Sequence, residues 1–197
     1  MSELAARAAT GPGHGSTYLS IDIDYWFASV LGENPPLNGL FKLLRAVRTK
    51  PCVVVEEHHQ LLPHLDEVAP TKVLHVDYHT DVAFPVEGRP IELNCGTFFW
   101  FMQNRADTTY RWFYPELDCP RELGLCMDAS YKPLARQNWI FKEQTRKLGL
   151  PTRKELASVT HVGIAISRDY CGDQDRVTRL LRVLKQRYLP HADWHAE

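Results

Sequence analysis

Short apolar runs alternate with amphipathic stretches along most of this chain. An apolar run of about four to eight residues is typical of a buried strand, whereas apolar side chains three and four positions apart indicate a helix. The apolar runs predict strands at residues 17–24, 52–55, 72–77 and 159–167. The helical spacing predicts helices at residues 37–48, 60–68, 93–103, 137–149 and 176–188.

Strands that alternate with helices favour an α/β protein with a mostly parallel sheet, because parallel strands need crossover connections. We see no internal repeat and no long linker, so we predict a single-domain three-layer α/β/α fold over residues 17–197. Residues 1–16 carry few large apolar side chains and are expected to form a flexible N-terminal segment. The pattern over residues 105–135 fits either a β-hairpin or irregular structure.

The composition narrows the classes of function. The chain has 197 residues, of which 44% are hydrophobic and 24% charged, as is normal for a soluble globular protein. The formal net charge of −1 gives no signal for a nucleic-acid partner. No apolar run reaches the ~18 residues that a membrane span needs. The five cysteines include no Cys-x-x-Cys pair, which favours reduced thiols in a cytoplasmic protein over disulfides or structural zinc.

One predicted strand, at residues 72–77, leads into side chains that bind metals. Asp77, His79 and Asp81 follow at alternate positions, and alternate side chains share one face while the chain stays extended. Carboxylate, imidazole and carboxylate on one face form a ligand set for a divalent metal. Burying three such groups without a counter-charge would be costly.

Two further strands end in the same way. The strand at 17–24 places Asp22 and Asp24 on one face, and the strand at 52–55 runs into Glu56-Glu57-His58-His59. Because open α/β sheets place their sites beyond the carboxyl ends of the strands, we predict one composite site.

Less specific interpretations apply to each motif taken alone. A lone Asp-x-Asp is more often a cap or a turn, and the His58-His59 pair alone could be an ordinary surface or core feature. The Asp-x-His-x-Asp run is more specific, because the apolar strand before it directs those groups to a buried edge. His75 shares the strand parity of Asp77, but we interpret it as packing rather than as a ligand.

The candidate set combines four carboxylates with two imidazoles and has no thiolate. That mixture suits Mn²⁺, Fe²⁺ or Co²⁺ better than structural zinc. Six ligands are many for one ion, so we predict two ions bridged by carboxylates, an arrangement that activates water.

These motifs carry a family resemblance. Val-Asp-Tyr-His-Thr-Asp at 76–81 resembles the Asp-x-His-x-Asp signature of the ureohydrolases, the arginase and agmatinase superfamily, and Ser-Ile-Asp-Ile-Asp at 20–24 resembles their Ser-x-Asp-x-Asp motif. Glu57-His58 resembles their Asp-His pair. Glu-Glu-His-His followed by Leu-Pro resembles an arginase-like family that includes peptide arginases, which convert arginine of ribosomally made precursor peptides to ornithine. Here the Asp-x-Asp motif comes first rather than last, so the resemblance implies an arginase-like fold with permuted motif order.

The resemblance implies two Mn²⁺ ions and a role for each ligand. Asp77 and Asp22 would bridge the ions, and Asp81 would also hydrogen-bond the attacking hydroxide. The remaining ligands would complete the two shells: His58 with Asp81 on one ion, and His79 with Asp24 on the other. A shift of one residue in register would exchange His58 for His59.

The resemblance also implies a reaction. A hydroxide bridging the ions would attack the guanidinium carbon of an arginine in a precursor peptide and release urea. No motif fixes the acid that orients the guanidinium; the candidates are Asp169, which we favour slightly, and Glu92. The aromatic residues at 98–101 and 112–114 could line a peptide groove, although core packing is the better interpretation for each. The alternatives are a small-molecule ureohydrolase, agmatinase-like or deacylase-like, and a non-catalytic protein that keeps the metal site.

Overall fold

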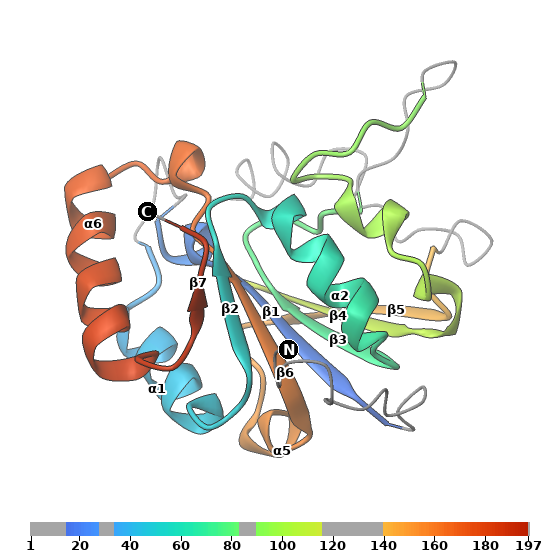
Figure 1. Ribbon diagram of the computed structural model, residues 1–197, viewed down its shortest axis with the longest axis horizontal. Helices are drawn as coiled ribbons and strands as arrows, with labels where there is room; N and C mark the ends of the chain where they lie inside the picture. The colour runs from blue at the N-terminus through green and yellow to red at the C-terminus, as the bar shows by residue number, and fades with distance from the viewer. Residues whose placement is uncertain (1–14, 28–33, 83–89, 116–139, 197) are drawn as a thin grey trace, which may run out of the picture.

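A seven-stranded parallel sheet forms the middle layer of the molecule (Figure 1). The computed structural model describes residues 15–27, 34–82, 90–115 and 140–196. The strand order is β5-β4-β3-β1-β6-β2-β7, and each neighbouring pair is parallel. The strands are β1 Thr17–Asp22, β2 Cys52–Val55, β3 Lys72–Val76, β4 Thr109–Tyr114, β5 Glu143–Leu148, β6 Val159–Ala165 and β7 Asp193–Trp194.

Helices cover both faces of this sheet, which confirms the predicted single-domain three-layer α/β/α fold (Figure 1). The α-helices are α1 Asn38–Val47, α2 Leu62–Val68, α5 Arg153–Ala157 and α6 Gln174–Val183, which continues into the π-helix η7 Leu184–Tyr188. The 3-10 helices are η1 Ile23–Trp26, η2 His58–Leu61, η3 Phe98–Phe101, η4 Arg105–Asp107 and η6 Arg168–Tyr170. Among the described residues, no helix has the length and apolar character needed to cross a membrane.

The alternation of side chains along the strands divides the core into two clusters. Leu19 and Ile21 of β1 pack in the cluster that α1, α5 and α6 cover, whereas Tyr18 packs on the opposite face with η2 and α2. Residues of β3 alternate in the same way, with Leu74 in the first cluster and Val73 in the second. Ser20 and Asp22 therefore lie on the same face of the sheet as Tyr18, and Asp22 is the last residue of β1, at the carboxyl edge of the sheet.

Three predicted helices are confirmed, with boundary shifts. The pattern at 37–48 corresponds to α1, the one at 60–68 to η2 and α2, and the one at 176–188 to α6 and η7. The predicted strands are also present, but those at 17–24, 72–77 and 159–167 end one or two residues early.

Two helix predictions are wrong. Residues 137–149 contain strand β5, which lies at the edge of the sheet and exposes charged side chains such as Glu143 and Arg146. An edge strand with one solvated side loses the apolar run that marks a buried strand, and its polar pattern resembles a surface helix. Residues 93–103 form a turn and the short η3 rather than one helix.

Residues 105–135, whose pattern fits either a β-hairpin or irregular structure, contain β4, and residues 116–135 lie outside the described residues. Most of the predicted flexible segment at 1–16 also lies outside them. The aromatic side chains of 98–101 and 112–114 follow the packing interpretation at Phe98, Phe99, Trp112 and Phe113, which are buried.

Gly163 of β6 brings η2 close to the sheet. A Cβ at this position would come within 3.0 Å of the Tyr18 hydroxyl and of both methyl groups of Leu61, closer than packed side chains normally allow. Glycine therefore lets the end of η2 settle on β6, and this contact holds the segment that begins with His58.

Glu155 links strands β4 and β5 to the start of α5. Its Oε2 accepts hydrogen bonds from the Thr152 backbone N–H at 2.8 Å and the Thr152 hydroxyl at 2.7 Å. Arg111 Nη1 of β4 lies 2.7 Å from Oε1, and Lys147 Nζ of β5 lies 3.4 Å from Oε2. Burial alone would raise the pKa of Glu155, but the Thr152 hydrogen bonds, with the Arg111 and Lys147 cations, lower it to about 2.

We expect Glu155→Gln to destabilise the protein at neutral pH and to have little effect near pH 2. A depressed folded-state pKa contributes stability above the unfolded value of about 4.5, and that contribution is lost as the pH falls toward about 2. With partial exposure of the pair, the loss at pH 7 should be roughly 1–3 kcal/mol. Urea unfolding at pH 7, 5 and 3 measures it, with the exposed Glu143→Gln as control. A difference between wild type and Glu155→Gln that stays constant with pH would contradict the assignment.

Candidate metal centre

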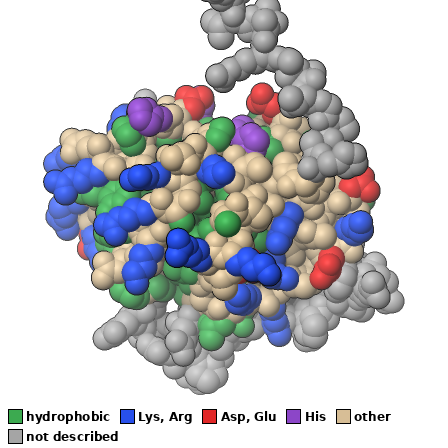
Figure 2. All heavy atoms as spheres, turned by 90° about the horizontal axis from the view of Figure 1, so that it is seen from below, with side chains coloured by type: hydrophobic (Ala, Val, Ile, Leu, Met, Phe, Trp, Pro, Cys, Tyr) green, Lys and Arg blue, Asp and Glu red, His purple; other side chains and the backbone are tan. Residues whose placement is uncertain are grey.

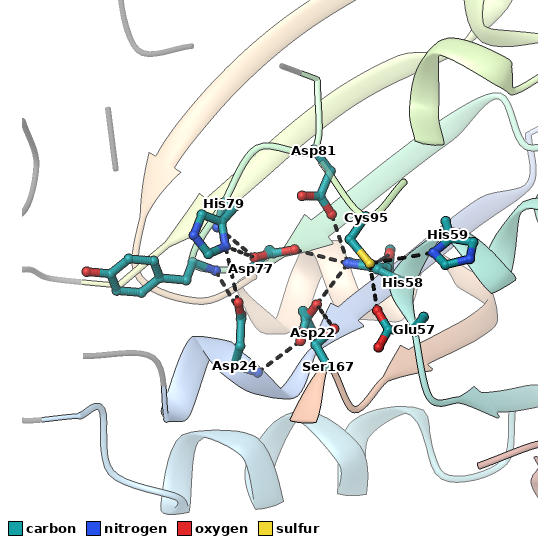
Figure 3. A network of polar contacts seen from close by, with 12 residues as sticks. Asp22, Asp24, Glu57, His58, His59, Asp77, His79, Asp81, Cys95 and Ser167 are labelled. Atoms are coloured by element: carbon teal, nitrogen blue, oxygen red, sulfur yellow. Dashed lines mark hydrogen bonds and ion pairs between the residues drawn. The ribbon is translucent and has the colours of Figure 1, made fainter. Parts of the chain in front are cut away.

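The carboxyl ends of three strands meet at one edge of the sheet. Asp22 is the last residue of β1, Asp77 directly follows β3, and His58 begins η2 shortly after β2. β3 and β6 flank β1, and β2 lies beyond β6. The parallel topology thus brings together side chains that are distant in sequence, as predicted for the strand ends (Figure 3).

The imidazole of His58 lies at the centre of this edge. Its Nδ1 is 3.0 Å from Asp22 Oδ2, 3.1 Å from Asp77 Oδ2 and 2.9 Å from Asp81 Oδ2. Its Nε2 is 2.8 Å from the hydroxyl oxygen of Ser20 on β1. All five side chains are buried. One ring nitrogen carries at most one proton, so it cannot satisfy three carboxylate oxygens at once.

His75 belongs to the same buried group, contrary to the packing interpretation of its role. Its Nε2 lies 3.2 Å from Asp77 Oδ2 and 3.7 Å from Asp81 Oδ2. His58, His75, Asp77 and Asp81 each offer one donor atom, and these four atoms lie within 4.8 Å of one another. The signal that could have found His75 was its shared strand parity with Asp77, since β3 directs Val73 and His75 to one face and Asp77 directly follows the strand.

A second group adjoins the first through Asp77. Donor atoms of Asp24, Asp77 and His79 also lie within 4.8 Å of one another. His79 Nδ1 is 3.1 Å from Asp24 Oδ2 and 3.7 Å from Asp77 Oδ1. The His79 side chain is 41% exposed, whereas the Asp24 side chain is 2% exposed, so this group faces solvent on its His79 side (Figure 3).

The predicted ligands converge, but not through strand alternation. β1 ends at Asp22 and β3 at Val76, so Asp24, His79 and Asp81 all lie outside the strands. Side-chain hydrogen bonds turn the chain instead: Asp22 Oδ1 accepts from the Asp24 N–H at 2.9 Å, and Asp77 Oδ1 accepts from the His79 N–H at 2.6 Å. Such local acceptors are the reason aspartate favours caps and turns.

Asp81 lies at the end of this turn in a left-handed conformation, with φ of 54°. Non-glycine residues rarely adopt such angles, and aspartate tolerates them better than most. The conformation returns the Asp81 carboxylate to the group around His58. The turn therefore brings Asp81 to the buried group, whereas an extended chain would place this carboxylate away from His58.

Carboxylates outnumber imidazoles where the two groups meet the adjoining Asp22. With Asp22 included, four carboxylates face three imidazoles, so with all four carboxylates ionised even full protonation of the rings would leave one negative charge in excess. Several of these buried atoms approach one another without a hydrogen bond of good geometry; they are His58 Nδ1, both ring nitrogens of His75, Asp77 Oδ2 and Asp81 Oδ2. Buried polar atoms without good hydrogen bonds are costly, and a metal ion satisfies donors of this kind together.

The pKa values reflect this crowding. Burial and the neighbouring Asp77 raise the pKa of Asp81 to about 8, and burial with Asp22 and Asp77 raises that of Asp24 well above its usual value. Burial alone would raise the pKa of Asp77, but the hydrogen bonds of His58 and His75 lower it well below its usual range. In the metal-free protein, protons on these carboxyl groups thus compensate part of the charge that a bound cation would neutralise.

The imidazoles respond in different directions. Burial alone would lower the pKa of His58, but Asp81, with Asp22 and Asp77, raises it well above its usual value. Burial lowers the pKa of His75, because its contacts with the carboxylates do not offset the desolvation. His75 therefore favours the neutral form that binds metals.

His58, rather than His59, faces the centre. His59 lies on the outer side of η2, where its Nδ1 is 3.6 Å from Cys95 Sγ (Figure 3). Ser167 is a further contact that sequence reasoning missed: its hydroxyl donates to Asp22 Oδ2 at 2.6 Å. Its position at the carboxyl end of the predicted strand at 159–167 was the available signal.

The two candidates for an orienting acid lie outside both groups. Asp169 is an exposed residue of η6, and Glu92 is exposed in the loop before η3. Tyr170, the neighbour of Asp169, contacts the His79 ring at a centroid distance of 6.2 Å. Thus η6 borders the solvent-facing side of the centre. The backbone carbonyl of Glu92 accepts hydrogen bonds from the Asn94 side-chain amide and the Thr97 hydroxyl.

The buried group of His58, His75, Asp77 and Asp81 could hold a metal ion. Its buried oxygen and imidazole donors fit a divalent cation. No protein-family model, curated protein or solved structure matches this chain.

We expect Mn²⁺ to raise the thermal stability of the protein and Asp77→Asn to remove most of that gain. An ion at a hundred times its dissociation constant stabilises the folded state by about 2.7 kcal/mol, which corresponds to a rise in Tm of roughly 5–10 °C. Asp77 belongs to both ligand groups, so its loss should affect every ion bound there. Thermal unfolding with Mn²⁺ and with chelator measures the gain, and the exposed Asp169→Asn is the control. A full Mn²⁺ response in Asp77→Asn would contradict the ligand set.

Metal binding should strengthen as the pH rises from 6 to 8. The pKa of about 8 at Asp81 means that this carboxyl carries a proton at neutral pH in the metal-free protein, and an ion must displace it. Each released proton should raise the affinity by roughly tenfold per pH unit below that pKa. Titration calorimetry in two buffers with different ionisation enthalpies counts the protons. Affinity that does not change with pH would show that the ion binds elsewhere.

Proposed function

We propose that this protein is a binuclear manganese hydrolase that converts an arginine of a precursor peptide to ornithine and urea. Hydrolysis consumes one water: its oxygen bonds to the guanidinium carbon, the bond from this carbon to the side-chain nitrogen breaks, and that nitrogen takes up a proton. The products are the ornithine amine and urea. The proposal rests on the ligand geometry and on the resemblance of the three motifs to ureohydrolases.

The shared position of Asp77 is the observation that carries the proposal. Its Oδ2 faces His58 Nδ1 at 3.1 Å, and its Oδ1 faces His79 Nδ1 at 3.7 Å. The two oxygens of one carboxylate thus point into two adjacent donor groups, as a bridging ligand requires. A site built for a single ion gains nothing from a second group of donors beside it.

The donor types favour manganese among the divalent ions. Both groups contain only carboxylate oxygens and imidazole nitrogens, which suit Mn²⁺ and similar ions. When bound, a pair of such ions supplies Lewis acidity and lowers the pKa of a water molecule toward neutrality. The protein's own contribution is to hold the ligands in place and to keep the surroundings buried.

Asp81 is placed to act on the attacking water. Its Oδ2 is buried and lies 2.9 Å from His58 Nδ1 without a hydrogen bond of good geometry. A carboxylate oxygen at this position can accept a proton or a hydrogen bond from a nucleophile within the centre. Asp81 would combine this role with metal binding, as the resemblance implies.

The substrate would approach from the side of His79. Tyr170 is 51% exposed and lies next to the half-exposed His79 ring. Aromatic faces attract guanidinium cations, and the adjacent Asp169 offers an exposed carboxylate for the same group. We therefore retain Asp169 as the preferred orienting acid and Glu92 as its alternative.

The resemblance to peptide arginases favours a peptide substrate over free arginine. Recognition of free arginine needs dedicated contacts to its α-amino and α-carboxylate groups, whereas a peptidyl arginine needs only a guanidinium site that is open to solvent. The exposed side of the centre at His79 and Tyr170 suits the second requirement.

The expected result is the loss of about 42 Da from a peptide per modified arginine, the mass of the CN₂H₂ removed when urea forms. The purified protein is incubated with Mn²⁺ and a panel of synthetic peptides, each carrying one internal arginine. Mass spectrometry follows the peptide and a colorimetric assay follows urea. Free arginine and agmatine are tested in parallel.

Variants connect the activity to the proposed roles. Asp77→Asn should reduce turnover by about a hundredfold or more, because both ions depend on it. Asp169→Asn should mainly raise KM, roughly tenfold, if it orients the cation. Glu143→Gln on the edge strand is the matched control and should behave as wild type. Hydrolysis of free arginine or agmatine without any peptide product would replace the proposal with a small-molecule ureohydrolase, and urea from none of the substrates would refute a ureohydrolase.

A further inference from the structure

A third group of donor side chains lies on the outer side of η2 and has no part in the proposed hydrolysis. Glu57, His59 and Cys95 are each half-buried, and their donor atoms lie within 4.8 Å of one another. Cys95 Sγ lies 2.9 Å from Glu57 Oε2 and 3.6 Å from His59 Nδ1 (Figure 3). This group alone among the three contains a sulfur ligand.

Two of the three ligands flank His58 in the chain. Glu57 precedes η2 in an extended conformation, with φ of −110° and ψ of 139°, and η2 begins at the next residue. The Glu57 backbone N–H donates to Gln60 Oε1 at 2.9 Å, which fixes the start of this helix. As a result, His58 points into the buried centre while Glu57 and His59 point away from it (Figure 3).

The third ligand comes from a hydrogen-bonded turn before η3. The Gly96 N–H donates to Asn94 Oδ1 at 2.9 Å, and the Asn94 N–H donates to Thr97 Oγ1 at 3.2 Å. The Thr97 hydroxyl also donates to the Glu92 carbonyl. These bonds on both sides of Cys95 present its thiol to Glu57 and His59 from a defined loop.

A role for Cys95 as a nucleophile does not fit this arrangement. A cysteine nucleophile needs a thiolate and a base that takes its proton. The thiol instead donates to Glu57, and His59 Nδ1 is at the longer distance. Burial and the Glu57 carboxylate raise the pKa of Cys95 to about 12, so the free thiol is unreactive at neutral pH.

We propose that Glu57, His59 and Cys95 form a site for a thiophilic divalent cation, with Zn²⁺ as the ion it would take. Carboxylate, imidazole and thiolate are all zinc ligands, and three of them from the protein leave a fourth position. The half-buried setting gives that position access to solvent. An ion would take the place of the thiol proton that now lies between sulfur and carboxylate.

The chemistry of the ligands separates this site from the buried centre. Soft thiolate selects zinc, whereas the oxygen-rich groups around Asp77 suit harder ions such as Mn²⁺. The two kinds of ion would therefore partition between opposite sides of η2. This inference is independent of the proposed hydrolase function, because it uses none of its ligands.

Co²⁺ is a suitable probe, because it replaces Zn²⁺ and absorbs in the near ultraviolet when a thiolate binds it. The full-length wild-type protein should gain this absorption on titration with Co²⁺, and excess Zn²⁺ should remove it. Cys95→Ser should abolish the band. Asp77→Asn, which disrupts the buried centre, should retain it.

Metal content gives an independent readout. After equilibration with Zn²⁺ and gel filtration, Cys95→Ser should carry about one Zn²⁺ fewer than wild type, while its Mn²⁺ content after loading with Mn²⁺ stays the same. His59→Ala should show the same loss, which distinguishes the site from a solitary cysteine. Circular dichroism confirms that each variant is folded.

The inference is overturned if saturating Co²⁺ gives no thiolate band in the wild type, or if the band survives in Cys95→Ser and so belongs to another cysteine. A band lost in Asp77→Asn but kept in His59→Ala would also overturn it, because sulfur would then belong to the buried centre. None of these outcomes depends on hydrolysis of arginine, so they are distinct from a failure of the proposed function.

Discussion

The convergence of three carboxylate oxygens on one nitrogen of His58 is the constraint around which this end of the molecule is built. Like charges in a buried place repel strongly, and each carboxylate there has given up its hydration. The fold tolerates this only because protons, imidazoles or a cation compensate it. The early ends of β1 and β3, the turn at 77–81 and the left-handed Asp81 all serve to direct carboxylates into that position.

The parallel sheet makes the order of the motifs along the chain unimportant for the site. What matters is that β1 lies between β3 and β6, with β2 beyond β6, and that all their carboxyl ends point the same way. A motif can occupy any strand in the sequence as long as the strand occupies the right place in the sheet. The proposed likeness to ureohydrolases therefore does not depend on the order of the motifs along the chain.

Much of the site could be predicted from the sequence, but for a reason that was partly wrong. Apolar strands that end at or just before Asp22, His58 and Asp77 identify this edge of the sheet, because strand ends follow from hydrophobic pattern and parallel topology. The positions of Asp24, His79 and Asp81 instead follow from local hydrogen bonds beyond the strands, which alternation cannot describe.

Other features were hidden because their sequence signal fits two environments. For a buried histidine within a strand, such as His75, the sequence alone predicts a core-packing residue, because its neighbours across the sheet are not known from the sequence. The sequence of the edge strand β5 resembles that of a surface helix, because a strand with one side in solvent carries polar residues and lacks a continuous apolar run. The hydrogen bond from the Ser167 hydroxyl to Asp22 depends on the pairing of β1 with β6, and no local sequence pattern specifies that pairing.

His58 and His59 are adjacent in the chain, but only His58 faces the buried carboxylates, and contacts of η2 with the sheet help to fix this orientation. A shift of one residue at the start of η2 would place the His59 ring in the buried centre and turn His58 outward. The register is set by the hydrogen bond from the Glu57 N–H to Gln60 and by the packing of Leu61 against Gly163. A Cβ on Gly163 would clash with both Leu61 and Tyr18, so glycine at this position lets η2 lie close to β6 in the register that turns His58 inward.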